Sequence, residues 1–170
     1  MKFLSGDAED REVFTPSTFV KYAADRRRIG IEDFGVNKIV VLLWSERVQR
    51  RLIEETNAKK AEKWFYKRRP LYNGSVDGKA LSIFASQVGA PATVMHMEEL
   101  IACGAKVFVA FGLAGSLQKS IATGCFVIPV SAVREEGTSY HYLPENVVPR
   151  PSESVVSVLE EACRNQKAAY

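Results

Sequence analysis

Two short apolar runs in the sequence constrain its fold more than any other feature. The first is KIVVLL at residues 38–43, and the second is KVFVAF at residues 106–111. A continuous apolar run such as the first is typical of a strand covered on both faces, because a strand with one wet face alternates apolar and polar residues. Segments with helical spacing separate the two runs. The runs therefore predict strands of an α/β domain.

Four segments of the sequence have the apolar spacing of helices. Capping residues support two of them, since Thr15 and Pro16 begin the first and Gly104 follows the third. A linker at residues 31–37 follows the first helix. The third helix places Val94, Met97, Leu100 and Ile101 on one face. The predicted helices cover residues 15–30, a segment around Val48, Leu52 and Ile53, residues 92–103, and residues 152–162.

Further strands are predicted between and after these elements. Residues 64–86 contain strand-like pieces, and the turn dipeptides Asn73-Gly74 and Asp77-Gly78 divide them into a meander of two or three antiparallel strands. The stretch Cys125–Val130 predicts one more strand. Together the elements predict a three-layer αβα domain with a mixed central sheet.

The composition is that of a single globular domain. The chain has 170 residues, of which 46% are hydrophobic, enough to bury a core. We expect one domain over residues 1–170, with an N-terminal helix and linker at 1–36 and an α/β core at 37–170. No stretch approaches the ~20 apolar residues of a membrane span, and the N-terminus lacks the apolar segment of a signal peptide. We expect a cytoplasmic protein without a membrane partner.

The cysteines and histidines do not form a metal or redox motif. Cys103, Cys125 and Cys163 are widely spaced, which predicts buried thiols rather than disulfides. His96 and His141 are the only histidines and lie far apart, so a zinc site would need distant carboxylates. We expect no metal, and we expect His96 to be a packed or surface residue rather than a catalytic one.

Basic residues are concentrated in two places, although the net charge is only +3. They are Arg26–Arg28 and the run from Lys59 to Arg69. Such clusters fit a nucleic-acid surface. The aromatic residues at 64–66 and Glu62 interrupt the second run, as on a solvated strand or helix face. A subunit contact or an anion site explains the charges equally, and we expect no nucleic-acid partner.

The sequence FGLAGSLQ at residues 111–118 directly follows the second apolar run. Gly112 and Gly115 would let backbone N–H groups approach a ligand at the carboxyl end of a strand, where α/β sheets bind ligands. The same pattern is also a plain strand terminator. It is neither the GxGxxG dinucleotide fingerprint nor a P-loop, because no Gly-Lys-Ser/Thr follows.

The order of the pieces resembles the purine nucleoside and uridine phosphorylase family. The pieces are GAP at 89–91, EEL at 98–100, a strand, GLAG at 112–115, Gly124, a strand, and REEGTSYHYLP at 134–144. The resemblance covers roughly residues 37–165, the N-terminal two-thirds of a family member. It implies a pentosyltransferase, in which phosphate attacks the anomeric carbon of a nucleoside to give the base and a pentose 1-phosphate. It also implies no organic cofactor and no metal, and a homo-oligomer that is a dimer or a hexamer of dimers.

The resemblance implies a phosphate grip of arginines and backbone N–H groups, from which this sequence departs. At the positions of the family's arginine, glycine and Thr or Ser, the chain has Ala110, Gly112 and Leu113. The family's Gly-Asp-Pro loop is also missing from this sequence, and only the arginine just beyond that loop has a counterpart, Arg47. Arg68 or Arg69 corresponds to an arginine that a neighbouring subunit contributes. The phosphate-binding residues implied are Arg47, Arg68 and Gly112.

The segment from Arg134 to Pro144 is the candidate second wall of the cleft. Its hydroxyls, imidazole and phenol suit contacts to sugar hydroxyls or stacking on a base. The alternative is a polar loop whose side chains cap one another, with Arg134 paired to Glu135 or Glu136. No catalytic residue is identified. The predicted nucleoside-binding residues are Gly115, Arg134, Thr138, Ser139, His141 and Tyr142.

Family members continue beyond the helix at 152–166, and that continuation carries base-recognition and ribose-binding residues. We therefore expect a domain truncated at its C-terminus, with an exposed sheet edge. Three functions stay open. The first is phosphorolysis of a purine or pyrimidine nucleoside, the second is nucleoside binding or subunit interaction without catalysis, and the third is nucleoside hydrolysis.

Overall fold

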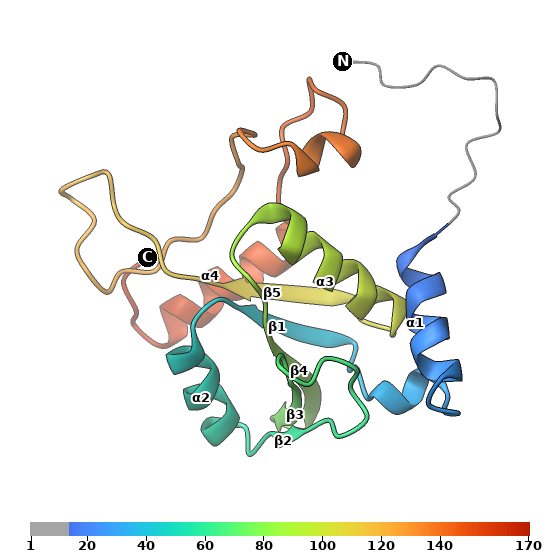
Figure 1. Ribbon diagram of the computed structural model, residues 1–170. Coiled ribbons are helices and arrows are strands. Elements are labelled where there is room, and N and C mark those ends of the chain that lie inside the picture. The colour runs from blue at the N-terminus through green and yellow to red at the C-terminus, as the bar shows by residue number, and fades with distance from the viewer. Residues whose placement is uncertain (1–13) are drawn as a thin grey trace.

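A five-stranded sheet is the centre of the fold, which a computed structural model describes for residues 14–170 (Figure 1). The strand order is β2-β3-β4-β1-β5. β4, β1 and β5 are parallel, whereas β2, β3 and β4 pair antiparallel, so the predicted mixed sheet is confirmed. Residues 1–13 of the predicted N-terminal segment, with the signal-peptide question, lie outside the described residues. The strands are β1 (Ile39–Leu43), β2 (Lys59–Lys60), β3 (Leu71–Val76), β4 (Lys79–Ala85) and β5 (Val107–Phe111).

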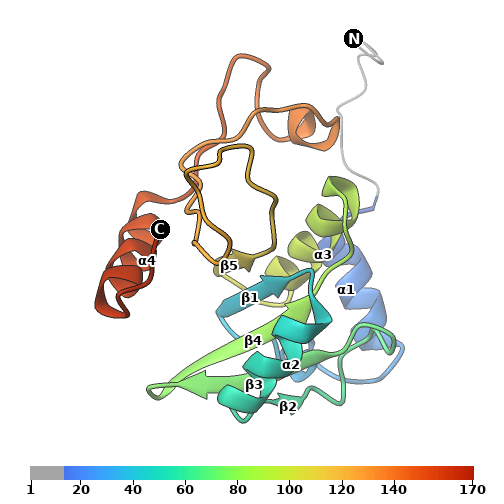
Figure 2. The same ribbon diagram turned by 90° about the vertical axis from the view of Figure 1, so that its left-hand side faces the viewer.

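Helices cover both faces of this sheet. Figures 1 and 2 show α1 and α3 on one face and α2 on the other, which confirms the three-layer arrangement. α1 begins as predicted, with Thr15 Oγ1 accepting the Thr18 N–H at 3.1 Å. It ends at Asp25 instead of near Gly30, because Arg28 adopts a φ of 56°. The helices are α1 (Pro16–Asp25), α2 (Glu46–Glu55), α3 (Ala90–Ala102) and α4 (Glu153–Asn165), with 3-10 helices η1 (Ile31–Phe34), inside the predicted linker, and η2 (Thr138–His141).

The apolar run of β1 supplies both layers of the core, because successive strand residues point to opposite faces. Val40 and Leu42 join a cluster beneath α1 and α3 that also contains Phe84 and Leu100. Leu43 lies in a smaller cluster on the α2 side. All five side chains are almost completely buried. β1 is therefore the central, doubly covered strand that its sequence predicts.

In the segment between β2 and β3 the aromatic residues at 64–66 pack into or against the core, whereas Glu62, Lys63, Lys67 and Arg68 are exposed, as the expected solvated face requires. Trp64 is 5% exposed. Its ring packs against Phe34, Phe65 and Phe84, with centroids 6.4, 4.0 and 5.8 Å away. The strand-like reading of residues 64–70 is wrong, since β3 begins at Leu71.

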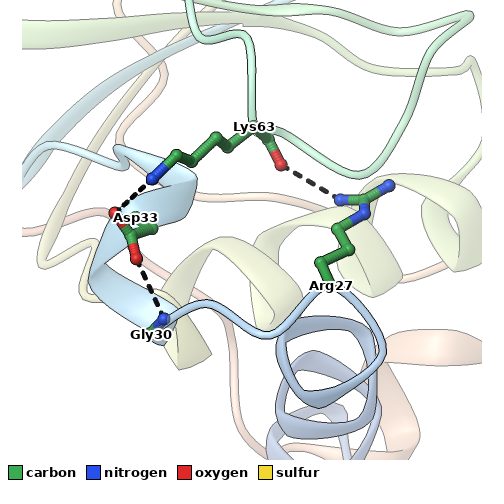
Figure 3. A network of polar contacts seen from close by, with 4 residues as sticks. All are labelled: Arg27, Gly30, Asp33 and Lys63. Atoms are coloured by element: carbon green, nitrogen blue, oxygen red, sulfur yellow. Dashed lines mark hydrogen bonds and ion pairs between the residues drawn. The ribbon is translucent and has the colours of Figure 1, made fainter.

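Two of the clustered basic residues hold this segment against the N-terminal part of the structure (Figure 3). Arg27 Nη1 donates to the Lys63 carbonyl at 3.0 Å, and Lys63 Nζ donates to Asp33 Oδ1 at 2.7 Å. The second oxygen of Asp33 accepts the Gly30 N–H at 2.9 Å. The Lys63 bond and the Gly30 bond lower the pKa of Asp33. Arg27 and Lys63 thus have structural partners, which accounts for part of the basic clusters without nucleic acid.

One of the two predicted turns is wrong. Asn73-Gly74 lies inside β3, where Gly74 pairs with Leu81. A Cβ at Gly74 would lie 2.6 Å from Thr56 Oγ1, so the glycine lets the chain after α2 approach the strand. The hairpin between β3 and β4 turns at Asp77 and Gly78, both with positive φ, as the second dipeptide predicts.

The strand predicted at Cys125–Val130 is also wrong. Within the described part of the chain β5 is the last strand of the sheet, and it is an exposed edge, as expected. The Phe126 N–H donates to the Ala169 carbonyl at 2.9 Å instead of to a strand. Pro129 has no backbone N–H that could donate to a neighbouring strand. An apolar run becomes a strand only when another strand pairs with it, and here none does.

Candidate functional site

Three parallel strands end at the same level on one edge of the sheet. Leu43 at the end of β1 pairs with Ala85 of β4 on one side and with Phe111 of β5 on the other. The chain then enters α2 on one face after β1 and α3 on the other face after β4 (Figure 2). Open α/β sheets bind ligands at the carboxyl ends of strands, where successive connections leave to opposite faces. The candidate site therefore lies at this edge.

Trp44, the first residue after β1, occupies the middle of the edge. Its Nε1–H donates to the Gln87 carbonyl at 3.0 Å and lies 3.2 Å from Thr93 Oγ1. A Cβ added to Gly112 would lie 3.3 Å from Trp44 Cε3, whereas one added to Gly115 would meet no atom within 4 Å. A side chain at Gly112 would therefore press against the indole ring of Trp44, whereas the same steric argument does not extend to Gly115.

A buried polar network lies behind the edge, between α3 and the segment at 61–70. Ser86 Oγ and His96 Nδ1 are 2.9 Å apart, and the Tyr66 hydroxyl donates to Glu99 Oε1 at 2.7 Å. His96 is 3% exposed and Glu99 is 6% exposed. Of the two positions expected for His96, packed or at the surface, the structure shows the packed one, with a polar partner just after β4.

Burial governs the titration of this network. It lowers the pKa of His96, with a smaller contribution from the positive charge of Arg69. It also raises the pKa of Glu99, against the opposing effect of the Tyr66 hydrogen bond. The sequence analysis missed the network, because its hydrogen bonds join α3 to residues of other elements. It also placed Ile101 on the buried face of α3, and Ile101 is 50% exposed. The helical spacing of His96, Glu99 and Leu100 was the available signal.

A pocket of about 190 Å³ opens between the first turn of α2 and the segment that leads into β3. Arg50 comes from α2, and Arg68 and Arg69 come from the segment before β3. Arg69 Nη1 donates to the Ala85 carbonyl at 3.3 Å, so the pocket borders the carboxyl end of β4. We call it the arginine pocket; its lining includes Glu46, Gln49, Arg50, Arg68, Arg69 and Ala85.

Arg134 is held inside its own loop. Its Nε donates to Ser139 Oγ at 3.1 Å, and its guanidinium lies 4.0 Å from the centre of the Tyr140 ring. Its terminal nitrogens donate to three backbone carbonyls at 2.5, 2.8 and 3.1 Å, those of Pro144, Leu143 and Val147. Backbone carbonyls, rather than Glu135 or Glu136, are thus the partners of this arginine.

Glu136 caps η2 within the same loop. Its carboxylate accepts the N–H groups of Thr138 and Ser139 at 2.7 and 3.0 Å. Hydrogen bonds from Ser139, followed by those from Thr138, lower its pKa to about 2. The Tyr142 hydroxyl donates to Glu98, which anchors the loop on α3. The geometry is that of the alternative reading, a loop whose side chains cap one another.

Residues 14–170 contain neither a candidate metal site nor a helix that could span a membrane. No cluster of three or more His, Cys, Asp or Glu side chains is placed to hold a metal ion there. None of the helices in that range is long and apolar enough to cross a membrane. Cys103 is the buried thiol that was predicted, and burial raises its pKa to about 12. Cys125 and Cys163 are only half-buried, which corrects that prediction.

Comparison with known proteins identifies the family to which this chain belongs. The family model described as the phosphorylase superfamily matches residues 38–170. The chain belongs to the phosphorylase superfamily. The resemblance inferred from the order of sequence pieces is therefore confirmed, over nearly the range predicted.

Relatives of this phosphorylase-superfamily chain match it over part of their length. A uridine phosphorylase of Treponema pallidum is 34% identical over 99 residues, which is 58% of this chain and 38% of the relative. A guanosine phosphorylase of Halorubrum lacusprofundi is 36% identical over 72 residues, 42% of this chain and 30% of the relative. The chain thus spans less than half the length of either relative.

Solved structures share the architecture. A uridine phosphorylase from Vibrio fischeri superposes with a TM-score of 0.73 and 25% identity, covering 81% of this chain and 57% of that one. A purine nucleoside phosphorylase from Toxoplasma gondii in complex with immucillin-H gives 0.73 at 22% identity, covering 83% of this chain and 56% of that one. The second likeness concerns the fold alone. Both support the predicted nucleoside-phosphorylase-like architecture.

The structure brings only some of the predicted site residues together. Arg68 lies in the arginine pocket, whereas Arg47 is exposed on α2 outside its lining, and Gly112 lies at the end of β5. Ala110 and Leu113 at that end are exposed. Sequence reasoning missed Gln49 and Arg50, which a helix places one turn from Glu46. The ligand roles of Arg47, Arg68, Gly112, Gly115, Arg134, Thr138, Ser139, His141 and Tyr142 stay predictions.

Proposed function

We propose that this chain binds a nucleoside at the common carboxyl edge of β4, β1 and β5 and supports its phosphorolysis. A phosphate oxygen forms a bond to the anomeric carbon, and the glycosidic bond breaks with its electron pair leaving on the base nitrogen. The products are the free base and a pentose 1-phosphate. The observation that carries this proposal is the aligned strand edge in a chain of the phosphorylase superfamily. Relatives named uridine and guanosine phosphorylase support the substrate class.

The chemistry asks for two features at such an edge. Phosphate needs cationic hydrogen-bond donors, and the pentose must be held in line with it while positive charge develops on the ring. Arginines stand beside the end of β4, which favours phosphate as co-substrate. We include in the proposal that no organic cofactor takes part.

The test is base release from a panel of purine and pyrimidine nucleosides, with and without phosphate. Phosphate-dependent release by the full 170-residue chain supports phosphorolysis and names the base. Release that is independent of phosphate refutes phosphorolysis and assigns hydrolysis. Absence of release in both conditions refutes both activities for this chain.

Nucleoside binding without catalysis is the second candidate, and the end of β5 favours it. Ala110 and Leu113 bring no charge or hydroxyl there, and Arg134 is engaged by backbone carbonyls. An arginine grip lost at this point removes charge-assisted bonds of about 1.5–3 kcal/mol each. Calorimetric titration with nucleosides, in the absence of turnover, identifies this function.

We further propose a homo-oligomer, a dimer or a hexamer of dimers, in the cytoplasm. The large exposed apolar side chains beyond β5 support association: Leu113, Leu117 and Val133 are 82%, 104% and 86% exposed. Free cysteines fit a reducing compartment. Light scattering of the purified chain measures the assembly, and a monomer at all accessible concentrations contradicts the proposal.

A further inference from the structure

The two outer strands of the sheet differ in how their edges are protected. β2, on one side, has only two residues, Lys59 and Lys60, and both are exposed. Short length and lysine side chains are common means by which sheets prevent their edges from pairing with another chain. β5, on the opposite side, has five residues, VFVAF, with no charge and no proline (Figure 2). The sheet is therefore closed to further pairing at β2 and open to it at β5.

The backbone of β5 presents hydrogen-bonding groups at this open edge. On the inner side, the Val107 N–H donates to the carbonyl of Lys38, just before β1, at 2.9 Å. The N–H and C=O groups of successive strand residues point to alternate sides, so those of Phe108 and Ala110 point away from β1. Within residues 14–170 no further strand pairs with β5. Each of these two residues thus offers a donor and an acceptor to a strand of another chain.

An uncharged stretch of the chain begins at this edge. Residues 107–133 contain one charged residue, Lys119, whereas 25% of the whole chain is charged. Among the large apolar side chains of this stretch, Leu117, Val127 and Val130 are 104%, 65% and 58% exposed. Depletion of charge is a property of the cores of protein interfaces rather than of surfaces that stay in water. We call residues 107–133 the uncharged surface.

The total surface of the chain is too large for a compact monomer. The accessible surface is 13061 Å² for a mass of 18.9 kDa. A compact monomer of this mass exposes roughly 8,300 Å². Residues 1–13 account for at most roughly 2,100 Å² of the difference, which is the limit for any segment of that mass. Roughly 2,600 Å² is left over, about three times what each partner buries in an interface of standard size.

A second copy of the chain fits the open edge. When β5 pairs antiparallel with the same strand of another copy, about a two-fold axis at Val109, Phe108 of each copy lies opposite Ala110 of the other, and their outward groups meet. Lys106 then lies opposite the uncharged glycine turn, so no like charges come together. The lysines of β2 close the outer side of each copy, so the assembly stops at two chains.

We infer that two copies of this chain associate through β5, which joins their sheets edge to edge, and bury the uncharged surface between them. The inference rests on the homo-oligomer proposed above, whose contact surface it names, and it does not depend on the proposed phosphorolysis. Because the two β5 strands run antiparallel, the candidate sites of the two copies lie at opposite edges of the joined sheet.

Light scattering of the full chain and of Ala110→Lys, over a range of concentrations, tests the inference. Ala110 is exposed on β5, and a lysine there gives the open edge the charge that protects β2. We expect the wild type to dimerise and Ala110→Lys to raise the dissociation constant at least about tenfold. Ser75→Lys is the matched control, because Ser75 is an exposed strand residue opposite Ala80, and it should leave the dimer unchanged. A monomeric wild type, or equal dissociation constants of the wild type and Ala110→Lys, overturns the inference.

Amide hydrogen exchange of the wild type, followed by NMR, is a second test that does not require a variant to fold. In the dimer we expect the amides of Phe108 and Ala110 to exchange at least about tenfold more slowly than in an unstructured peptide, because a second strand accepts their hydrogen bonds. Val107 is the internal reference, since its N–H is bonded on the β1 side whether or not the chain dimerises. Fast exchange at Phe108 and Ala110 in a dimeric chain places the contact elsewhere and overturns the inference.

The outcomes separate this inference from the proposed function. Protected amides at Phe108 and Ala110 in a dimer that releases no base support the contact and refute phosphorolysis. A dimer that releases base but leaves these amides unprotected supports the activity and refutes the contact. A monomer at all concentrations overturns the inference and leaves the open edge to a strand of a different polypeptide.

Discussion

Replacing Tyr66 by phenylalanine breaks the contact that holds the segment before β3 against α3. The phenol donates to Glu99 Oε1 at 2.7 Å, and Glu99 is only 6% exposed. Its other oxygen, Oε2, already lacks a hydrogen-bond partner within residues 14–170. The variant therefore leaves a buried carboxyl group without its side-chain donor. The same segment carries Arg68 and Arg69, so the contact also supports the arginine pocket.

The magnitude follows from the type of bond. A hydrogen bond to a charged group contributes about 1.5–3 kcal/mol, and for a chain of this size 1 kcal/mol shifts Tm by about 2–4 °C. We expect Tyr66→Phe to lower Tm by roughly 3–12 °C. The loss should be smaller in acid, because without the Tyr66 bond the pKa of Glu99 rises further and the group is buried in its neutral form.

Urea denaturation of the wild type, Tyr66→Phe, Glu99→Leu and the double variant measures the contact as a double-mutant cycle. We expect a coupling energy of at least about 1 kcal/mol at neutral pH. Tyr22→Phe is the control, because the Tyr22 side chain is exposed and its hydroxyl only accepts a bond from Arg26; its effect should stay within about 0.5 kcal/mol. Additive effects of the two changes would refute the reasoning.

Three further changes test the core and the edge. Leu100→Ala should lower the free energy of unfolding by about 2–5 kcal/mol. Ile101→Ala, at the neighbouring position that is 50% exposed, should lower it by less than about 1 kcal/mol. Equal losses in urea denaturation would contradict the assignment of Leu100 to the buried face of α3. The lowered pKa of His96 means that the unfolded chain binds the proton more readily, so stability is full above about pH 6.5 and falls below it. Thermal melts from about pH 7.5 to about 5.5 should show a smaller loss in His96→Gln, and parallel pH profiles would rule this out. Gly112→Val should displace Trp44 and abolish nucleoside binding, measured by calorimetry. Gly115→Ala should leave nucleoside binding intact. Normal binding by Gly112→Val would mean that Gly112 only turns the chain and has no part in the site.

Local patterns predicted most of the elements that build this fold. The run at 38–43 is a doubly covered strand, the helix before Gly104 is α3, and Asp77-Gly78 is the hairpin turn. Each depends on residues within a few positions of one another. The wrong predictions depend instead on contacts between residues that are far apart in the sequence. Cys125–Val130 is as apolar as a strand but finds no strand to pair with, and Gly74 is small because Thr56 packs against it.

The candidate site divides in the same way. From the sequence alone we predicted that strand ends would carry the ligand edge, and the resemblance implied that Arg68 binds phosphate as an arginine contributed by a neighbouring subunit. Only the tertiary structure showed that Arg134 is held by its own loop carbonyls, while Gln49 and Arg50 of α2 meet Arg68 and Arg69 at one pocket.

The sequence by itself determined most of the elements, their order and the family resemblance, because periodicity, capping residues and turn dipeptides act over short separations. The tertiary structure decided which polar groups meet. The Tyr66–Glu99 bond joins residues 33 positions apart, and the Arg27–Lys63 bond joins residues 36 apart. Such pairs depend on the register of β1 with β4 and β5 and on how α3 packs over them. Neither of these is encoded in the local pattern of either partner.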